Sequence, residues 1–451
     1  MGLGEITDPG RPWTRAAFSE RHHQGREFLA ARMREAGLET SVDAAGNLIG
    51  RREGSAPNAR TIMIGSHSDT VLGGGRFDGI AGVIAGLEIA ATLKDSGARL
   101  RHALEIVDFL AEEPNEFGLS CIGSRGMAGA LDVDMLARTN RAGVTLRDAI
   151  EAVRSAVGRA GAGVGGPGAA GGRGAGAGDV GAYGSGVGAA AGAGGVGAGG
   201  SGAGAVGADG VHVGARRTDV AAFFELHIEQ GPVLEAQGRD VGVVTHIAGI
   251  RRLALTFKGQ AAHAGTTPLD LRRDALVAAS RFVLDLRRAL ERRPESQPFV
   301  IATVGEIHVG PNAANVVPGE ARLIVDLRSD ASEALVTWTD RIRAIAETVV
   351  SDTQVQLTQC RLLSATEPTT CAPELASLLR QGARELGLKQ QDIVSGAGHD
   401  AAFIARVAPA AMLFVPSRGG MSHCAEEWTE SAALAKGVET LLHAVRQFDA
   451  S

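Results

Sequence analysis

This 451-residue chain lacks cysteine motifs, long apolar runs and phosphate-binding motifs. Its four cysteines, Cys121, Cys360, Cys371 and Cys424, show no C-x-x-C spacing, which argues against both a disulfide framework and a thiolate zinc site. We expect each to be a small buried side chain in a reducing environment. No apolar run is long enough to span a bilayer, and no G-K-[ST] motif is present to bind a phosphate.

The charge and the N-terminus exclude further classes of protein. The net charge of −6 argues against nucleic acid as a partner. The first residues include no apolar stretch typical of a signal peptide. From the cysteine spacing we expect a cytoplasmic protein. The length and an apolar content of 44% predict a globular chain of two domains.

Short apolar runs alternate with helical stretches over most of the chain. Runs such as TIMIGS and AAMLFV predict buried strands of a largely parallel sheet. Residues 245–360 instead follow the order β-α-β-β-α-β, which is typical of a ferredoxin-like domain. The predicted fold class is therefore α/β: a main domain with a mixed, largely parallel sheet, built from residues 1–244 and 361–451, with a ferredoxin-like domain inserted at 245–360.

Residues 158–215 have a different composition, rich in glycine and alanine. Glycine in a helix costs ~1 kcal/mol relative to alanine, and the segment has too little apolar surface to form a core. We expect a disordered insert there.

Acids and histidines follow four of the predicted strands at the point where each strand ends. The segments are GSHSD, AEEPNEFG, ELHIEQG and MSHCAEEW. Because ligand sites gather at the carboxyl ends of parallel strands, we expect these segments to share one pocket. The candidate side chains, with the aspartate of GGRFDG, are His67, Asp78, Glu112, Glu113, His227 and His423.

These side chains are suitable ligands for metal ions. Three histidines and two carboxylates supply enough donors for two divalent ions if one carboxylate bridges them, and nitrogen and oxygen donors suit zinc, manganese or cobalt. Paired ions ~3.5–4 Å apart are typical of hydrolytic enzymes. Asp69 is expected to orient the imidazole of His67. Because Glu112 and Glu113 are adjacent, one can bind metal while the other acts as a general base.

Each of these residues also has a plain structural interpretation. Asp78 can cap the helix that follows it. The adjacent Glu112 and Glu113 can be a solvated loop pair. We expect Glu426 and Glu427 to be such a pair. Recurrence at four strand ends favours a site over these alternatives.

An ordered series of motifs resembles that of the hydantoinase/carbamoylase amidases, which are relatives of the dinuclear zinc exopeptidases. The motifs are GSHSDT, GGRFDG, AEEPNEFG, ELHIEQGP, GQAAHAGTTPLDLRRDA, NVVPGEARLIVDLR, SGAGHDA and MSHCAEEW. The resemblance implies hydrolysis of the ureido C–N bond of N-carbamoyl-L-amino acids, N-carbamoyl-β-alanine, allantoate or ureidoglycolate. It also implies a homodimer in which the inserted domain serves for dimerisation and as a lid.

The resemblance assigns roles by position. It implies two divalent ions per subunit, Zn²⁺, Mn²⁺, Co²⁺ or Ni²⁺, with Glu112 as the general base. The implied ligands are His67, Asp78 and His227 for one ion, and Asp78, Glu113 and His423 for the other.

Further positions match residues that contact the substrate. The implied substrate-binding residues are Gln230, Asn315, Arg328 and His399. His263 is implied to stabilise the oxyanion at the partner subunit's site. From the residues alone, Arg328 can instead pair with Asp326, and Asn315 can be a turn residue.

The sequence departs from the family pattern in two places. EEPNEFG replaces a glycine-containing EEG form, which is expected to change the pocket beside Glu113. The insert replaces a helical connection. Two other functions stay open: a dinuclear metallopeptidase or deacylase, and a binding protein without catalysis. Glu112 argues against the second, since a binding protein needs no free base beside a metal.

Overall fold

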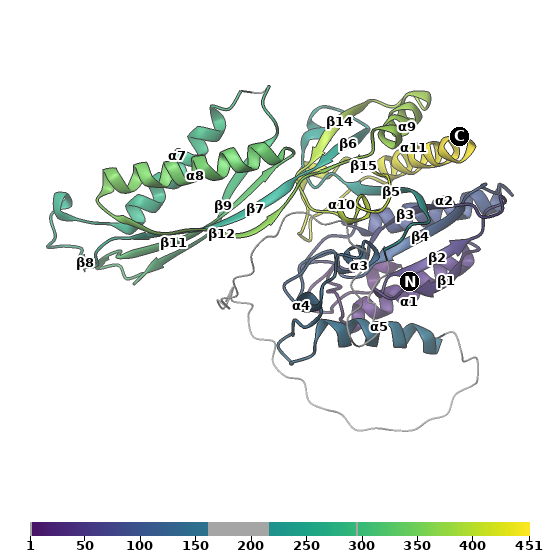
Figure 1. Cartoon of the computed structure of the whole chain (residues 1–451), viewed down its shortest axis with the longest axis horizontal. Coiled ribbons are helices and arrows are strands. Elements are labelled where there is room, and N and C mark those ends of the chain that lie inside the picture. Colours follow the sequence, from purple (N-terminus) through teal and green to yellow (C-terminus); the bar gives the residue numbers. More distant parts are fainter. Residues whose placement is uncertain (1, 161–215, 295) are drawn as a thin grey trace.

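The structure is a computed structural model that describes residues 2–160, 216–294 and 296–451. It is elongated, with a larger part built around a broad sheet and a narrower part that extends from it (Figure 1). Helix α5 runs from Leu146 to Ala160 and so includes the start of the Gly/Ala-rich stretch. The rest of the predicted disordered insert, 161–215, lies outside the described residues.

Among the described residues, nine strands form the larger sheet. The neighbours β4, β3, β5 and β15 are parallel, whereas β1, β2 and β13 add antiparallel pairings. The predicted α/β class with a mixed sheet is confirmed. In sheet order the strands are β1 (Glu39–Val42), β2 (Leu48–Arg52), β4 (Ala103–Phe109), β3 (Thr61–His67), β5 (Val220–Ile228), β15 (Ala410–Val415), β6 (Val241–Ile247) and β13 (Thr369–Thr370), with β14 (Gln390–Ser395) paired to β6.

The central strands are apolar along their length because helices cover both faces of this sheet. In β3, Ile62 and Ile64 pack on one face with α1, α2, α9 and α11, while Met63 packs on the other with α3 and α10. The helix bounds are α1 (Glu20–Glu35), α2 (Ile80–Asp95), α3 (Ile122–Met127), α4 (Val133–Leu136), α6 (Val233–Ala236), α9 (Pro373–Glu385), α10 (Ala401–Ile404) and α11 (Ser431–Ala450), and short 3-10 helices cover Leu3–Glu5, Leu269–Leu271 and Arg418–Gly420.

The narrower part follows the order strand, helix, strand, strand, helix, strand. Its elements are β7 (Gly249–Lys258), α7 (Ala275–Glu291), β9 (Val300–Gly310), β11 (Glu320–Ser329), α8 (Ser332–Thr353) and β12 (Gln356–Thr366). In the part of the chain that is described, these strands form an antiparallel sheet in the order β12-β7-β11-β9. Helices α7 and α8 cover one face, where Phe257, Phe282 and Trp338 are buried.

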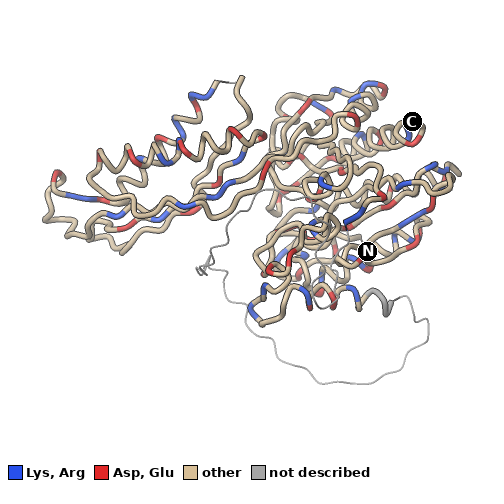
Figure 2. The backbone as a smooth tube through the Cα atoms, viewed as in Figure 1, with Lys and Arg blue, Asp and Glu red and all other residues tan. Residues whose placement is uncertain are grey.

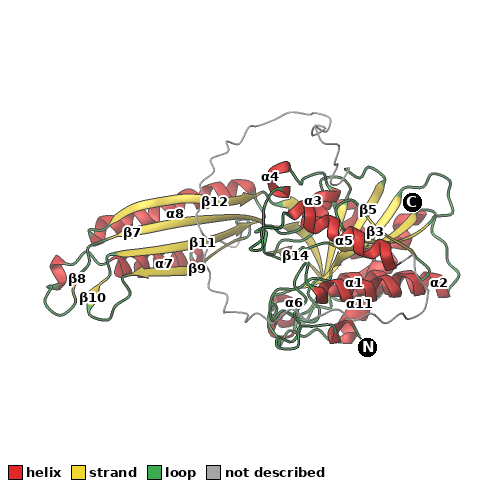
Figure 3. Cartoon of the chain, turned by 90° about the horizontal axis from the view of Figure 1, so that it is seen from below, coloured by secondary structure: helices red, strands yellow, loops and turns green. Residues whose placement is uncertain are grey.

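A small strand pair forms the tip of the narrower part. Strands β8 (Ala262–His263) and β10 (Val316–Val317) pair there, at the end opposite the larger sheet (Figures 1 and 3).

Charges of both signs are interspersed over both parts (Figure 2). None of the described helices has both the length and the apolar character needed to cross a membrane. Cys121 and Cys371 are buried as expected, whereas Cys360 and Cys424 are only half-buried. The expectation fails for these two because Cys360 lies on the edge strand β12 and Cys424 lies in a loop.

A buried ion pair joins α1 to the larger sheet. Arg26 Nε lies 3.1 Å from Asp108 Oδ2 on β4, and Arg26 Nη2 donates to the carbonyl oxygen of Gly46 at 2.7 Å. Both side chains are buried. Arg26→Ala would leave the Asp108 carboxylate without its partner, so we expect a loss of about 3–5 kcal/mol in the free energy of unfolding.

The matched control is Arg32→Ala on the same helix, because Arg32 and its partner Glu35 are both exposed. We expect this variant to lose less than about 1 kcal/mol. Chemical denaturation followed by circular dichroism measures both variants. Equal midpoints for the two variants would contradict the role assigned to Arg26.

Candidate metal centre

Four neighbouring strands of the larger sheet deliver the candidate side chains. The parallel strands β4, β3, β5 and β15 end at the same edge of the sheet, where the chain places polar residues on or just after each strand. The side chains at this edge are His67 on β3, Glu112 and Glu113 after β4, His227 on β5 and His423 after β15.

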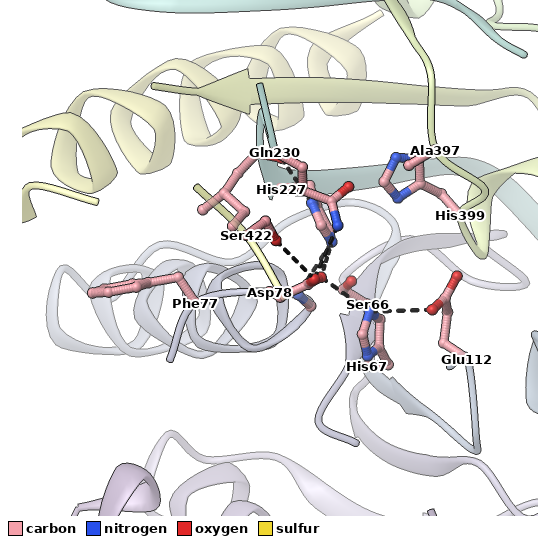
Figure 4. A network of polar contacts seen from close by, with 12 residues as sticks. Ser66, His67, Phe77, Asp78, Glu112, His227, Gln230, Ala397, His399 and Ser422 are labelled. Atoms are coloured by element: carbon pink, nitrogen blue, oxygen red, sulfur yellow. Dashed lines mark hydrogen bonds and ion pairs between the residues drawn. The ribbon is translucent and has the colours of Figure 1, made fainter. Parts of the chain in front are cut away.

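Asp78, just before α2, lies at the centre of these side chains. Its Oδ1 is 3.1 Å from Nε2 of His227 and 3.8 Å from Nε2 of His67 (Figure 4). Its Oδ2 is 2.9 Å from Nε2 of His423. The N-cap of α2 is Gly79, and the Asp78 side chain contacts the three histidines instead. Although burial favours a neutral carboxyl, contacts with His227 and His423 hold the pKa of Asp78 well below its usual value.

Two sets of donor atoms share this carboxylate. Within each set the atoms lie within 4.8 Å of one another. The sets are His67, Asp78 and His227, and Asp78, Glu113 and His423. These are the groupings that the family resemblance implies. The first set is buried, whereas the second is open on the side of His423, whose side chain is 47% exposed.

The two buried histidines are oriented as metal ligands require. Nδ1 of His67 lies 2.9 Å from the main-chain oxygen of Asp69, and Nδ1 of His227 lies 2.9 Å from that of Ile228. The neutral ring of His67 donates its Nδ1 proton to the Asp69 carbonyl, so its lone pair is on Nε2, which faces Asp78. For His227, burial favours the neutral ring, but the hydrogen bond to Asp78 raises its pKa to about 9, and a metal ion would take the place of the Nε2 proton.

Glu112 and Glu113 lie side by side in the loop after β4. Their main-chain N–H groups donate to the two carboxylate oxygens of Asp69, at 3.2 and 3.1 Å. Oε1 of Glu113 is 3.5 Å from Nε2 of His423, and Oε2 of Glu112 is 3.5 Å from Nε2 of His67. Asp69 therefore orients His67 through its backbone and the two glutamates through its side chain.

The raised pKa values of the two glutamates indicate a site suited to cations. Burial raises the pKa of Glu113 to about 8 and the pKa of Glu112 well above its usual value, and repulsion from nearby carboxylates adds to both. Burial lowers the pKa of His67 to about 4. Positive ions among these groups would offset the repulsion, so the donor set fits divalent metals.

The EEPNEFG loop is closed by one side chain. Asn115 Nδ2 donates to the main-chain oxygens of Glu113 and Leu119, at 3.2 and 2.8 Å, and its Oδ1 accepts from the N–H of Phe117 at 3.1 Å. Asn115, in the segment that departs from the family motif, thus fixes the backbone beside Glu113.

Two of the expected substrate-binding residues join the cluster. Gln230 Nε2 donates to Asp78 Oδ2 at 2.9 Å. The His399 ring packs edge-on against His227 with centroids 4.6 Å apart, and its Nε2 lies 2.8 Å from Oγ of Ser395 (Figure 4).

Arg328 lies on β11 beside the loop that leads to His399. Its Nη1 donates to the main-chain oxygen of Gly396 at 2.7 Å, and its Nε donates to Asp326 at 2.6 Å. The pairing with Asp326 is therefore present, together with contact to the GAGHD segment.

His263 and Asn315 do not reach the cluster within this chain. His263 is on β8, and the main-chain oxygen of Asn315, in the turn before β10, accepts from the N–H of Ala264 at 3.0 Å. Both residues are exposed at the tip of the narrower part (Figures 1 and 3).

Two buried glutamates were not anticipated from the sequence. The expectation of a solvated pair is wrong for Glu427, which is buried, while Glu426 is exposed. Glu225 on β5 is also buried and accepts from Ser66 Oγ at 2.7 Å and from the N–H of Ala401 at 3.0 Å. The burial of Glu225 could have been suspected from the sequence, because it is an acid within an otherwise apolar strand.

Comparison with known proteins agrees with this geometry. Residues 63–447 match the sequence profile of the peptidase family M20/M25/M40, and the chain belongs to this family. N-carbamoyl-L-amino-acid amidohydrolase of Paenarthrobacter aurescens is 36% identical, over 99% of this chain and 96% of that protein. Allantoate amidohydrolase of Bacillus subtilis (strain 168) is 33% identical, over 95% and 90%.

A solved structure is similar over the whole chain. The hydantoinase/carbamoylase family amidase from Burkholderia multivorans has a TM-score of 0.81 and 32% identity, over 100% of this chain and 96% of that one. The resemblance to the hydantoinase/carbamoylase amidases is confirmed.

Proposed function

We propose that this chain is a metal-dependent amidohydrolase that cleaves the ureido C–N bond of an N-carbamoyl-L-amino acid. The observation that carries the proposal is the pair of donor sets that share Asp78, with Glu112 beside them but in neither set. Relatives named N-carbamoyl-L-amino-acid amidohydrolase, allantoate amidohydrolase and ureidoglycolate hydrolase support the ureido class of substrate.

The metal-binding roles follow from the two donor sets. One divalent ion would be held by His67, Asp78 and His227, and the other by Asp78, Glu113 and His423. Nitrogen and oxygen donors suit Zn²⁺, Mn²⁺, Co²⁺ or Ni²⁺. When bound, such ions polarise a carbonyl and lower the pKa of water.

Glu112 is the proposed general base. Its Oε1 accepts from the Cys121 thiol at 3.4 Å, so Oε2 is the oxygen that faces His67 and the site. Glu112 takes a proton from the water that attacks the ureido carbonyl and returns it to the leaving nitrogen. Ammonia departs, and the remaining carbamate loses carbon dioxide to give the amino acid.

His263 is the proposed oxyanion donor. The N–H of Gly265 donates to its Nδ1 at 3.1 Å, so the neutral ring carries its proton on Nε2. That N–H can donate to the carbonyl oxygen as negative charge develops. Arg272 holds the loop, because its Nε donates to the main-chain oxygen of Thr267 at 2.9 Å.

The remaining proposed contacts hold the substrate. Arg328 would bind its carboxylate together with Asn315, which like His263 would come from the partner subunit, since a guanidinium and an amide both donate to carboxylate oxygens. Gln230 and His399 lie against Asp78 and His227, where they would border the reacting group.

We further propose that residues 249–366 are an inserted ferredoxin-like lid and dimerisation domain. The strand order β12-β7-β11-β9 supports this assignment. These boundaries differ from the range 245–360 that the sequence predicts. Strand β6 pairs with β15 and so belongs to the larger sheet, and β12 continues to Thr366.

We also propose a homodimer with shared sites, because His263 does not reach the cluster within its own chain. Leu269 and Leu271, close to it in sequence, are 81% and 68% exposed, which favours a protein contact there. A cytoplasmic location is supported by the four cysteines, which are all described and are free thiols.

The test of the function is ammonia release from a substrate panel. The panel contains N-carbamoyl-L-amino acids, N-carbamoyl-β-alanine, allantoate and ureidoglycolate. A dipeptide and an N-acetyl amino acid detect peptidase or deacylase activity, and for these two compounds release of the free amino acid is measured, because their cleavage yields no ammonia. We expect turnover of a ureido acid that chelation abolishes and that added Mn²⁺, Co²⁺, Ni²⁺ or Zn²⁺ restores. Full turnover by protein shown to be metal-free by elemental analysis would refute the mechanism.

Glu112→Gln tests the base within the same assay. This variant is expected to keep its metal ions and to lose about 10²–10⁴-fold in turnover, because the amide cannot accept the proton. Glu116→Gln, an exposed residue of the same loop, is the matched control and should match the wild type. Normal turnover by Glu112→Gln would place the base elsewhere.

Mixing subunits tests the shared site. The heterodimer combines one Glu112→Gln subunit with one His263→Ala subunit. If each subunit donates His263 to its partner's site, one site carries both substitutions and the other site carries neither. Random re-pairing of equal amounts makes about half of the dimers mixed, so about a quarter of wild-type activity should return. Verified subunit exchange without recovery would show that His263 serves its own subunit, and full activity of His263→Ala alone would show that it has no catalytic role.

A further inference from the structure

The two donor sets differ in how the fold fixes their histidines. His67 and His227 lie on buried strands of the larger sheet. His423 lies in a loop, has a φ of +56° and is 47% exposed. A residue other than glycine keeps such a φ only where its surroundings impose it. Contacts outside the donor sets must therefore keep His423 close to Asp78.

Glu427 makes those contacts. It is 1% exposed, and its Oε1 accepts from the N–H groups of Phe77 and Asp78, at 2.8 and 3.1 Å. Its Oε2 accepts from the hydroxyl of Ser422 at 2.8 Å, and that hydroxyl is also 3.3 Å from Asp78 Oδ2 (Figure 4). One carboxylate thus joins the backbone of Asp78 to the residue that precedes His423.

The loop around Asp78 is shaped to receive this carboxylate. A Cβ atom at Gly75 would lie 1.8 Å from Glu427 Oε1, so the approach requires glycine there. The next residue, Trp428, packs edge-on against Phe77 with ring centroids 5.5 Å apart, and the guanidinium of Arg76 lies 5.4 Å from the Trp428 ring centroid. The segment after His423 and the segment before Asp78 therefore pack together over several residues.

We propose that Glu427 is a positioning residue for the second donor set. Through Ser422 and the backbone of Asp78, it keeps His423 next to Oδ2 of Asp78, which lies 2.9 Å from His423 Nε2. The first set also uses Asp78, through Oδ1, but strands of the larger sheet carry its two histidines, so it depends much less on this link. Loss of Glu427 therefore weakens binding of the second ion much more than binding of the first. The inference rests on the metal centre described under the proposed function.

Calorimetric titration of the metal-free full chain with Mn²⁺ tests this inference. The wild type is expected to bind two ions per chain. Glu427→Ala should bind one ion nearly as tightly as the wild type and the other about 10- to 100-fold more weakly, the usual effect of losing a residue that supports a ligand. Glu427→Gln should restore both affinities, because its oxygen accepts from the N–H groups and its amide donates to Ser422. Glu426→Ala is the exposed control and should match the wild type.

The outcomes separate the inference from the function. Unchanged binding of both ions by folded Glu427→Ala, or equal weakening of both, would overturn the inference. If Glu427→Ala does not fold, Ser422→Ala removes the bridge alone: a weaker second ion supports the inference and unchanged binding overturns it. A wild type that binds fewer than two ions overturns the metal centre and the inference together. Two bound ions without ureido turnover would refute the proposed function and leave the role of Glu427 standing.

Discussion

The shared carboxylate of Asp78 is the interaction on which the site depends. Oδ1 faces the histidines of one donor set and Oδ2 faces His423 of the other. Both sets require Asp78 to be fixed in position, but it lies in a loop rather than on a strand. The surroundings of that loop therefore matter as much as the strands that carry His67 and His227.

Both ends of the chain hold the loop that carries Asp78. From the N-terminal segment, Thr14 Oγ1 accepts from the N–H of Gly73 at 2.7 Å, and Arg15 Nε donates to the main-chain oxygen of Ser68 at 2.8 Å. From the C-terminal side, Glu427 binds the N–H of Asp78 itself. The larger sheet supplies the donors at its strand ends, and these flanking segments supply the rigidity that a preformed metal site needs.

The sequence was sufficient for the parts of the site that follow from strand periodicity. Buried apolar runs predicted the strands, and their common direction predicted that His67, His227 and the acids after β4 would meet. The contacts that individual side chains make with distant segments could not be predicted from the sequence. The prediction for Glu427 was wrong because adjacent acids in a loop are usually solvated, whereas its burial depends on hydrogen bonds to Phe77 and Asp78 and on the close approach at Gly75, all distant in sequence. The position of His263 at a distant tip depends on how two domains are arranged, which local patterns do not encode.

Anomalous diffraction from crystals of the wild-type chain grown with Mn²⁺ or Zn²⁺ tests the central claim most directly. The account predicts two peaks ~3.5–4 Å apart, one on each side of Asp78, with His67 and His227 at one and Glu113 and His423 at the other. A single peak at full metal occupancy, or two peaks that do not share Asp78, would contradict it.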